Sequence, residues 1–157
     1  VDVNNALNGD GPYAPERTGG LPLDGVLALL REGTCSIDAL MKKITRTGGV
    51  YSYLGTVDMR EVESRVHNGD ELAELALNGM IYQIAKEVGA MATVLKGCVD
   101  AIVITGGVAH SEMLLEWISE RVAWIAPLLI YPGEDEMLAL VQGALRVLRG
   151  EEQAQEY

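Results

Sequence analysis

Apolar residues recur at helical spacing through most of this chain, and two short apolar runs near its end resemble buried strands. Helices are predicted over residues 23–30, 37–44, 59–66, 70–95, 111–122 and 134–148, and strands over residues 101–105 and 128–131. Asp58 has the side chain and position of an N-cap. The order at the end, strand, helix, strand, helix, predicts an α/β fold in which a helix-rich part precedes a parallel strand pair.

Two parallel strands are too few for a complete sheet, because a parallel sheet needs both faces covered and its edges paired. Either residues 1–3 and 50–54 supply further strands, or the partner strands lie in an N-terminal part that this chain lacks. The chain starts with Val1 instead of methionine. A cut from a longer protein and a processed or trimmed terminus both explain that start.

The long helix over residues 70–95 is apolar over much of its surface, and its spacing predicts one buried side. That side is predicted to consist of Leu72, Leu75, Ala76, Ile84, Val88, Met91 and Leu95.

The strand over residues 101–105 runs into Gly106 and Gly107, and a helix follows Ser111. Ligands of open α/β sheets bind outside the carboxyl ends of the strands, where paired glycines let a ligand approach the backbone. A tight turn between strand and helix explains the pair equally well, since neither GxGxxG nor GxxxxGK[ST] is present.

Charge and composition exclude several classes of partner. The net charge of −11 argues against a nucleic-acid partner, which requires a basic face. No window is apolar enough to span a bilayer, and Cys35 and Cys98 form no CxxC pair. We therefore expect a cytoplasmic protein of 157 residues without membrane contact, built around one core.

Four segments closely resemble the C-terminal half of butyrate kinases, which belong to the acetokinase family. They are residues 2–22 with Asn4-Asn-Ala-Leu7 and Pro12-Tyr-Ala-Pro-Glu-Arg-Thr-Gly-Gly20, then Tyr53-Leu-Gly-Thr-Val-Asp-Met-Arg60, Val103-Ile-Thr-Gly-Gly-Val108 and Tyr131-Pro-Gly-Glu-Asp-Glu-Met137. Because these segments are spread over nearly the whole chain, the resemblance is more specific than one glycine pair.

The resemblance implies a ribonuclease H-like domain of the actin-like ATPase superfamily. Residues 1–157 would form the C-terminal nucleotide-binding domain of a two-domain kinase, without its N-terminal domain. Such a kinase moves the γ-phosphoryl group of ATP to a short-chain carboxylic acid, giving ADP and an acyl phosphate, with Mg²⁺ as cofactor. It also implies a homo-oligomer.

Seven residues match family positions with a functional role. Arg31 resembles the active-site arginine, although a solvated arginine at a helix end would look the same. Asp58 and Arg60 match an adenosine-contacting element, and Gly106 and Gly107 match the loop beside the adenine and phosphates.

Asp135 and Glu136 match an acidic pair linked to magnesium, although acidic residues are common in a first helical turn. Arg17 is a weaker candidate for a functional residue, because it lies in a loop rich in glycine and proline that could fold over the substrate. No role is assigned to His67 or His110. The alternative function is a non-catalytic ATP-binding switch on the same fold, as in actin-like and chaperone-like relatives.

Overall fold

The computed structural model describes residues 2–6, 9–133 and 136–154. Its elements are α1 (Leu23–Arg31), α2 (Ile37–Thr45), α3 (Gly49–Leu54), α4 (Met59–His67), α5 (Glu71–Val94), β1 (Ile102–Gly106), the 3₁₀ helix η2 (Gly107–His110), α6 (Glu112–Val122), β2 (Leu128–Pro132) and α7 (Glu136–Leu148). The predicted order, a helix-rich part before a strand, helix, strand, helix ending, is confirmed.

Side-chain caps begin four of the described helices, and at α2 the Ser36 side chain accepts a hydrogen bond from the Ala39 N–H group. Asp58 accepts a hydrogen bond from the Arg60 N–H group at α4, and Ser111 accepts one from the Leu114 N–H group at α6. Asp70 caps α5 and also forms an ion pair with Arg65 of α4, with 2.7 Å between Oδ2 and Nε. The predicted cap at Asp58 is therefore confirmed, and Asp70 fixes the corner between two helices.

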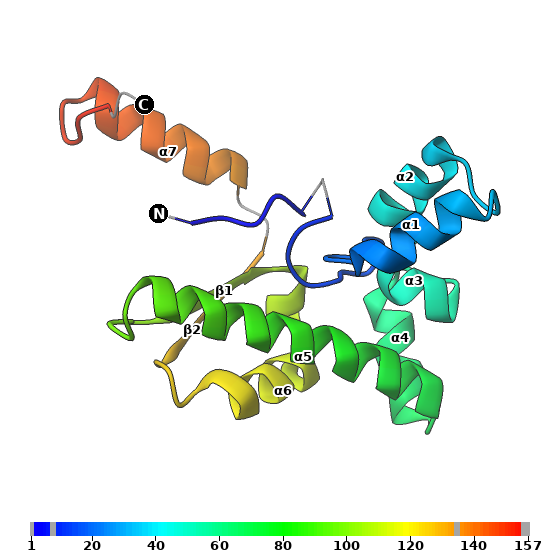
Figure 1. Ribbon diagram of the computed structural model, residues 1–157. Helices are drawn as coiled ribbons and strands as arrows, with labels where there is room; N and C mark the ends of the chain where they lie inside the picture. Colours follow the sequence, from blue (N-terminus) through cyan, green and yellow to red (C-terminus); the bar gives the residue numbers. More distant parts are fainter. Residues whose placement is uncertain (1, 7–8, 134–135, 155–157) are drawn as a thin grey trace.

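β1 and β2 are parallel, with Ile102 opposite Leu128 and Gly106 opposite Pro132. In the described ranges they form a two-stranded sheet, and α6 lies between them in the sequence. Figure 1 shows α5 and α6 beside the strands, α1 to α4 at the other end of the molecule, and α7 standing apart from α5 and α6.

The core lies where α3, α4 and α6 pack against α5. Its buried members are Val50, Val62, Ala73, Leu77, Met80, Ile81, Leu114, Ile118 and Val122. Tyr13 and the strand residues Ile102 and Ile104 cover the edge of this cluster. The core therefore joins the helical part of the chain to one face of the sheet.

Residues 50–54 do not supply a strand, so that alternative is wrong for this segment. They lie in α3, where the Val50 N–H group donates to the Ala14 carbonyl and the Tyr51 N–H group donates to the Pro15 carbonyl. Valine and tyrosine favour strands when a neighbouring strand is available. Here carbonyl groups of the opening loop accept the hydrogen bonds of the first amide groups in the segment. Gly55, in a left-handed conformation, ends the short helix.

The predicted buried side of the long helix is partly wrong. Leu72 and Leu75 are 46% and 71% exposed, whereas Ala73, Leu77 and Ile81 are fully buried. Apolar residues occur on more than one face of α5, so spacing alone does not fix which face turns inward.

One face of the sheet remains uncovered by the described residues. Val103 is 59% exposed and Tyr131 is 59% exposed, although the apolar run predicted a fully covered strand. The apolar side chains of α7 are also exposed, including Leu140 at 68% and Leu148 at 81%. Strand and helix thus both have apolar surface available for further contacts.

In the described ranges, no helix is both long and apolar enough to cross a membrane.

Candidate functional site

The loop that follows β1 and the loop that follows β2 meet at the carboxyl end of the sheet. The Gly106 N–H group donates a hydrogen bond of 3.2 Å to the Gly133 carbonyl, and Thr105 Oγ1 donates one of 3.5 Å to the same oxygen. Two segments that the sequence singled out separately therefore lie side by side.

The two glycines of the pair have different reasons for being glycine. Gly106 has φ 74° and ψ −160°, a backbone conformation that side-chain-bearing residues rarely adopt. Gly107 does not have a positive φ, and a Cβ on either residue would meet no atom within 4 Å. Among the described residues, neither the backbone nor packing requires glycine at position 107, and the space above the pair is open to a ligand.

The predicted magnesium pair adjoins this loop in the sequence. Asp135 lies outside the described residues, and Glu136 is the first residue of α7, three positions after Gly133. The described part of the chain holds no cluster of three or more histidine, cysteine, aspartate or glutamate residues suited to a metal ion. The assignment of Mg²⁺ to Asp135 and Glu136 stays a prediction.

Asp58 and Arg60 form a fork at the start of α4. Arg60 Nε donates to Asp58 Oδ1 at 3.0 Å, and Arg60 Nη2 donates to Asp58 Oδ2 at 2.9 Å. These hydrogen bonds hold the pKa of the Asp58 carboxyl below its ordinary value and raise the pKa of Arg60. The Arg60 side chain is 91% exposed, so the pair presents a fixed guanidinium and carboxylate to solvent.

Arg31 is the last residue of α1 and is exposed. It borders a pocket of about 410 Å³ with Asp24, Leu27, Ala28 and Glu32. No ion pair or side-chain hydrogen bond within the described ranges joins Arg31, Asp58 or Arg60 to the glycine loop, and Figure 1 shows α1 apart from the strands. The structure thus brings the glycine pair together with Gly133, and leaves Arg31, Asp58 and Arg60 on other elements.

The opening loop, residues 9–20, is hydrogen-bonded to both α3 and α5, and the sequence analysis did not predict these contacts. Tyr13 donates its hydroxyl hydrogen to the Ala76 carbonyl, and its N–H group donates to Gln83 Oε1 at 3.0 Å. Burial, followed by the nearby Tyr53, raises the pKa of Tyr13 to about 12. Gly79 on α5 is the signal for this contact, because a Cβ there would lie 2.6 Å from the Tyr13 hydroxyl oxygen.

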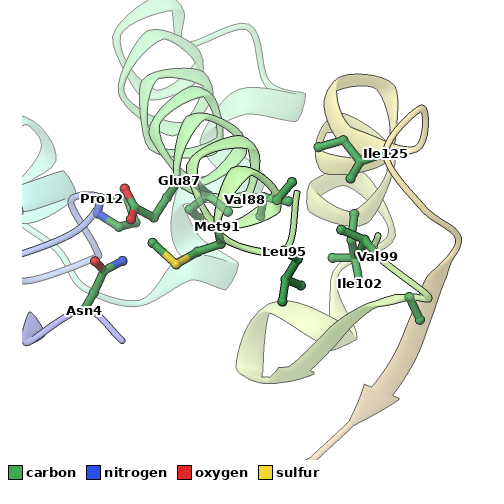
Figure 2. A pocket seen from close by; sticks show the side chains of 12 residues that line it. Asn4, Pro12, Glu87, Val88, Met91, Leu95, Val99, Ile102 and Ile125 are labelled. Atoms are coloured by element: carbon green, nitrogen blue, oxygen red, sulfur yellow. The ribbon is translucent and has the colours of Figure 1, made fainter. Parts of the chain in front are cut away.

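A pocket of about 350 Å³ lies at the opposite end of β1 from the glycine pair (Figure 2). It is lined mostly by apolar side chains, among them Val88, Met91, Leu95 and Ile102. A phosphate group would lose its hydration there without gaining matching donors. This pocket is therefore unsuited to a phosphate-bearing ligand.

Arg17 lies half-buried in the opening loop. His67 Nδ1 is 2.8 Å from the Glu63 carbonyl within its own helix, and Cys35 and Cys98 are free thiols. These contacts give the histidine a local structural role and leave the cysteines without a partner among the described residues.

Solved structures with the same fold include acetate and propionate kinases. An acetate kinase from Porphyromonas gingivalis superposes with a TM-score of 0.77 at 22% identity, over 88% of this chain and 41% of that one. A propionate kinase from Francisella tularensis subsp. tularensis SCHU S4 superposes with a TM-score of 0.67 at 26% identity, over 74% of this chain and 30% of that one. The predicted fold class, that of the actin-like ATPases, is confirmed.

The sequence comparisons are more specific. Butyrate kinase 1 of Clostridium acetobutylicum is 48% identical over all 157 residues, and a probable butyrate kinase of Enterococcus faecalis is 49% identical over the same length. Residues 14–124 match the acetokinase family, and the chain belongs to that family. It spans 44% of the length of these two relatives.

Proposed function

We propose that this chain is the C-terminal nucleotide-binding domain of a two-domain kinase that phosphorylates butyrate or a similar short-chain carboxylic acid with ATP. The observation that carries the proposal is 48% identity to a butyrate kinase along the full 157 residues. The open space above Gly106 and Gly107, at the end of the sheet where α/β folds bind ligands, supports it.

The reaction proposed is reversible phosphoryl transfer. A carboxylate oxygen forms a bond to the γ-phosphorus of ATP while the bond to the β,γ-bridging oxygen breaks, and the products are acyl phosphate and ADP. The carboxylate is already ionised near neutral pH, so no general base has to remove a proton. Catalysis then depends on positioning the reactants and on neutralising the negative charge of the substrate carboxylate and of the ATP phosphates.

The residues of this chain would divide these tasks. Arg31 would neutralise charge on the transferred group, and the fork of Asp58 and Arg60 would contact the adenosine. Gly106 and Gly107 would let the nucleotide approach the backbone. Asp135 and Glu136 would hold Mg²⁺, which supplies charge neutralisation at the phosphates.

Arg31 requires further protein around it for this role. It lies on an exposed helix end, and no ion pair fixes it within the described ranges. The missing N-terminal domain is proposed to close over this surface and over the exposed Val103 and Tyr131. The isolated chain should therefore be inactive, and the active protein is proposed to be a cytoplasmic homo-oligomer.

The alternative, a non-catalytic ATP-binding switch, is less well supported. A switch requires the nucleotide site alone, whereas the relatives that match this entire chain are butyrate kinases. Release of ADP that stays independent of any added short-chain acid would favour the switch.

The test is ATP-dependent formation of a hydroxamate from butyrate by the full-length protein. Arg31→Ala should lower kcat about 100-fold or more, the magnitude typical for loss of one group that stabilises charge in a transition state. Lys43→Ala, a basic residue in the last turn of α2, is the matched control and should leave kcat unchanged. No hydroxamate from the wild-type protein would overturn the kinase assignment, and equal activity of both variants would overturn the role of Arg31.

A further inference from the structure

The 3₁₀ helix η2 places a histidine directly beyond the glycine pair. Gly107 is the first residue of η2 and His110 is its last. A 3₁₀ helix has three residues per turn, so residues three positions apart lie above one another on the same side. His110 is therefore aligned with Gly107 and lies about 6 Å further along the axis at 2.0 Å per residue.

Burial shows which side of η2 faces the solvent. Ala109 is 3% exposed, and Val108 packs against the core cluster. Gly107 and His110 are both exposed. These two residues form one outward surface, which we call the η2 face.

The backbone of His110 is held in place, whereas its ring is free. The next residue, Ser111, is buried; its N–H group donates to the Val108 carbonyl at 3.1 Å, and its hydroxyl oxygen accepts from the Leu114 N–H group at 3.1 Å. Among the described residues, no ion pair or side-chain hydrogen bond engages the His110 ring. The ring thus has a fixed attachment and is available to a ligand.

The composition around the η2 face suits a nucleobase better than a phosphate group. Residues 97–120 contain no lysine or arginine, and Glu112 follows His110 by two positions. Phosphate groups bind most strongly to charged donors such as arginine and lysine. A base requires a flat open surface and a ring on which to stack, and every base has such a stacking face. Gly107, above which a Cβ would meet no described atom within 4 Å, supplies the surface, and His110 supplies the ring.

From this alignment we infer that His110 is a nucleotide-contacting residue, whose imidazole stacks on the adenine of an ATP molecule lying against Gly107. The inference rests on the proposed function, because it takes ATP as the ligand of the glycine loop. It adds a ring on η2 to the proposed adenosine contacts of Asp58 and Arg60 on α4.

The experiment is isothermal titration calorimetry of ATP with the full-length protein and three variants at His110. His110→Phe keeps a flat ring and loses both ring nitrogens, so the dissociation constant should stay within about threefold of wild type. His110→Gln keeps polar atoms and loses the ring, and His110→Ala loses both. In these two variants the dissociation constant should rise about tenfold, as expected for loss of one stacking contact. All three should keep the melting temperature of the wild type, because the ring has no partner among the described residues.

His67→Ala is the matched control, since His67 is also exposed and is the last residue of a helix, α4. Its Nδ1 lies 2.8 Å from the Glu63 carbonyl of the same helix, so the variant should bind ATP as the wild type does. Unchanged binding in His110→Ala would overturn the contact with the nucleotide. Normal binding in His110→Gln with weak binding in His110→Phe would show a polar contact instead and overturn the stacking.

A wild-type protein that binds no ATP would overturn the inference as well. Calorimetry is carried out without butyrate, so it reads the nucleotide site and not the reaction. ATP binding that depends on the His110 ring, in a protein that forms no hydroxamate, would keep this inference and remove the kinase assignment.

Discussion

The Tyr13 hydroxyl donates a hydrogen bond to the Ala76 carbonyl, and this contact fastens the opening loop to the middle of α5 across 63 positions of sequence. The N–H group of the same tyrosine donates to Gln83 Oε1, about two turns further along the helix. The loop in turn accepts hydrogen bonds from Val50 and Tyr51 of α3. One aromatic residue thus couples α3 to α5, the described helix that supplies more members of the core cluster than any other.

Tyr13→Phe should therefore destabilise the protein by about 1 kcal/mol, the net value of one hydrogen bond whose acceptor is left in a partly buried site. Urea denaturation of the full-length protein measures the change. Tyr53→Phe is the control, since Tyr53 is 58% exposed and its hydroxyl makes no hydrogen bond among the described residues. Equal effects of the two variants would contradict the assigned contact.

The raised pKa of Tyr13 also predicts a pH dependence of stability. Its pKa rises from 10.0 to about 12 on folding, chiefly because burial disfavours the phenolate. Between pH 10 and pH 12 the unfolded chain loses this proton while the folded chain keeps it, so stability falls as pH rises. The free energy of unfolding should decline less steeply across this window in Tyr13→Phe than in wild type. Parallel slopes would argue that Tyr13 is solvated.

Gly49 and Gly55 offer a paired test of how closely the opening loop packs. Both have positive φ, 56° and 72°, so alanine strains the backbone at each. A Cβ at Gly49 would lie 1.8 Å from the Ala14 carbonyl oxygen, whereas one at Gly55 would meet nothing within 4 Å. Gly55→Ala should cost about 1 kcal/mol and Gly49→Ala about 3 kcal/mol or more. Similar thermal shifts for both would rule out the close approach.

Local signals were enough to predict most of the fold. Asp58 and Ser111 mark helix starts because their side chains cap exposed N–H groups, and this chemistry is independent of tertiary context. Two errors arose where tertiary contacts decide. The segment 50–54 is helical because carbonyl groups of the opening loop accept hydrogen bonds from its first amide groups. Leu75 is exposed because α5 has apolar residues on several sides, and the side with Leu77 and Ile81 packs against the core instead.

The candidate site could be predicted only in part. The glycine pair follows a strand, so its place at the carboxyl end of the sheet could be inferred from local pattern, and Gly106 has the backbone that only glycine favours. Arg31 and the fork of Asp58 and Arg60 lie on other helices. Their proposed roles came from the resemblance to butyrate kinases. The spacing of apolar and polar residues does not relate a residue on α1 or α4 to a site at the end of β1.

Asp58 caps α4 and is also proposed to contact the adenosine together with Arg60, and substitutions can separate the two roles. Asn is as good a helix cap as Asp, so Asp58→Asn should leave thermal stability unchanged, whereas Asp58→Ala should lower the melting temperature. Both variants remove the carboxylate that holds Arg60 through Oδ1 and Oδ2. If the fork contacts the nucleotide, KM for ATP should rise about tenfold in both. A normal KM in the Asn variant would leave Asp58 as a cap alone.

Gly107 gives the sharpest test of where the nucleotide lies. Its φ is not positive and a Cβ would meet no described atom within 4 Å, so Gly107→Ala should leave thermal stability unchanged. A nucleotide lying against the loop would collide with the added methyl group, and KM for ATP should rise about tenfold or more while the fold is intact.

Gly89→Ala is the control for that variant, because Gly89 also has open space and lies in the interior of α5. It should change neither stability by more than about 1 kcal/mol nor KM. Gly106→Ala, by contrast, should lower stability through its backbone strain before any ligand binds. Normal ATP affinity in Gly107→Ala, with the fold preserved, would move the nucleotide away from the carboxyl end of β1.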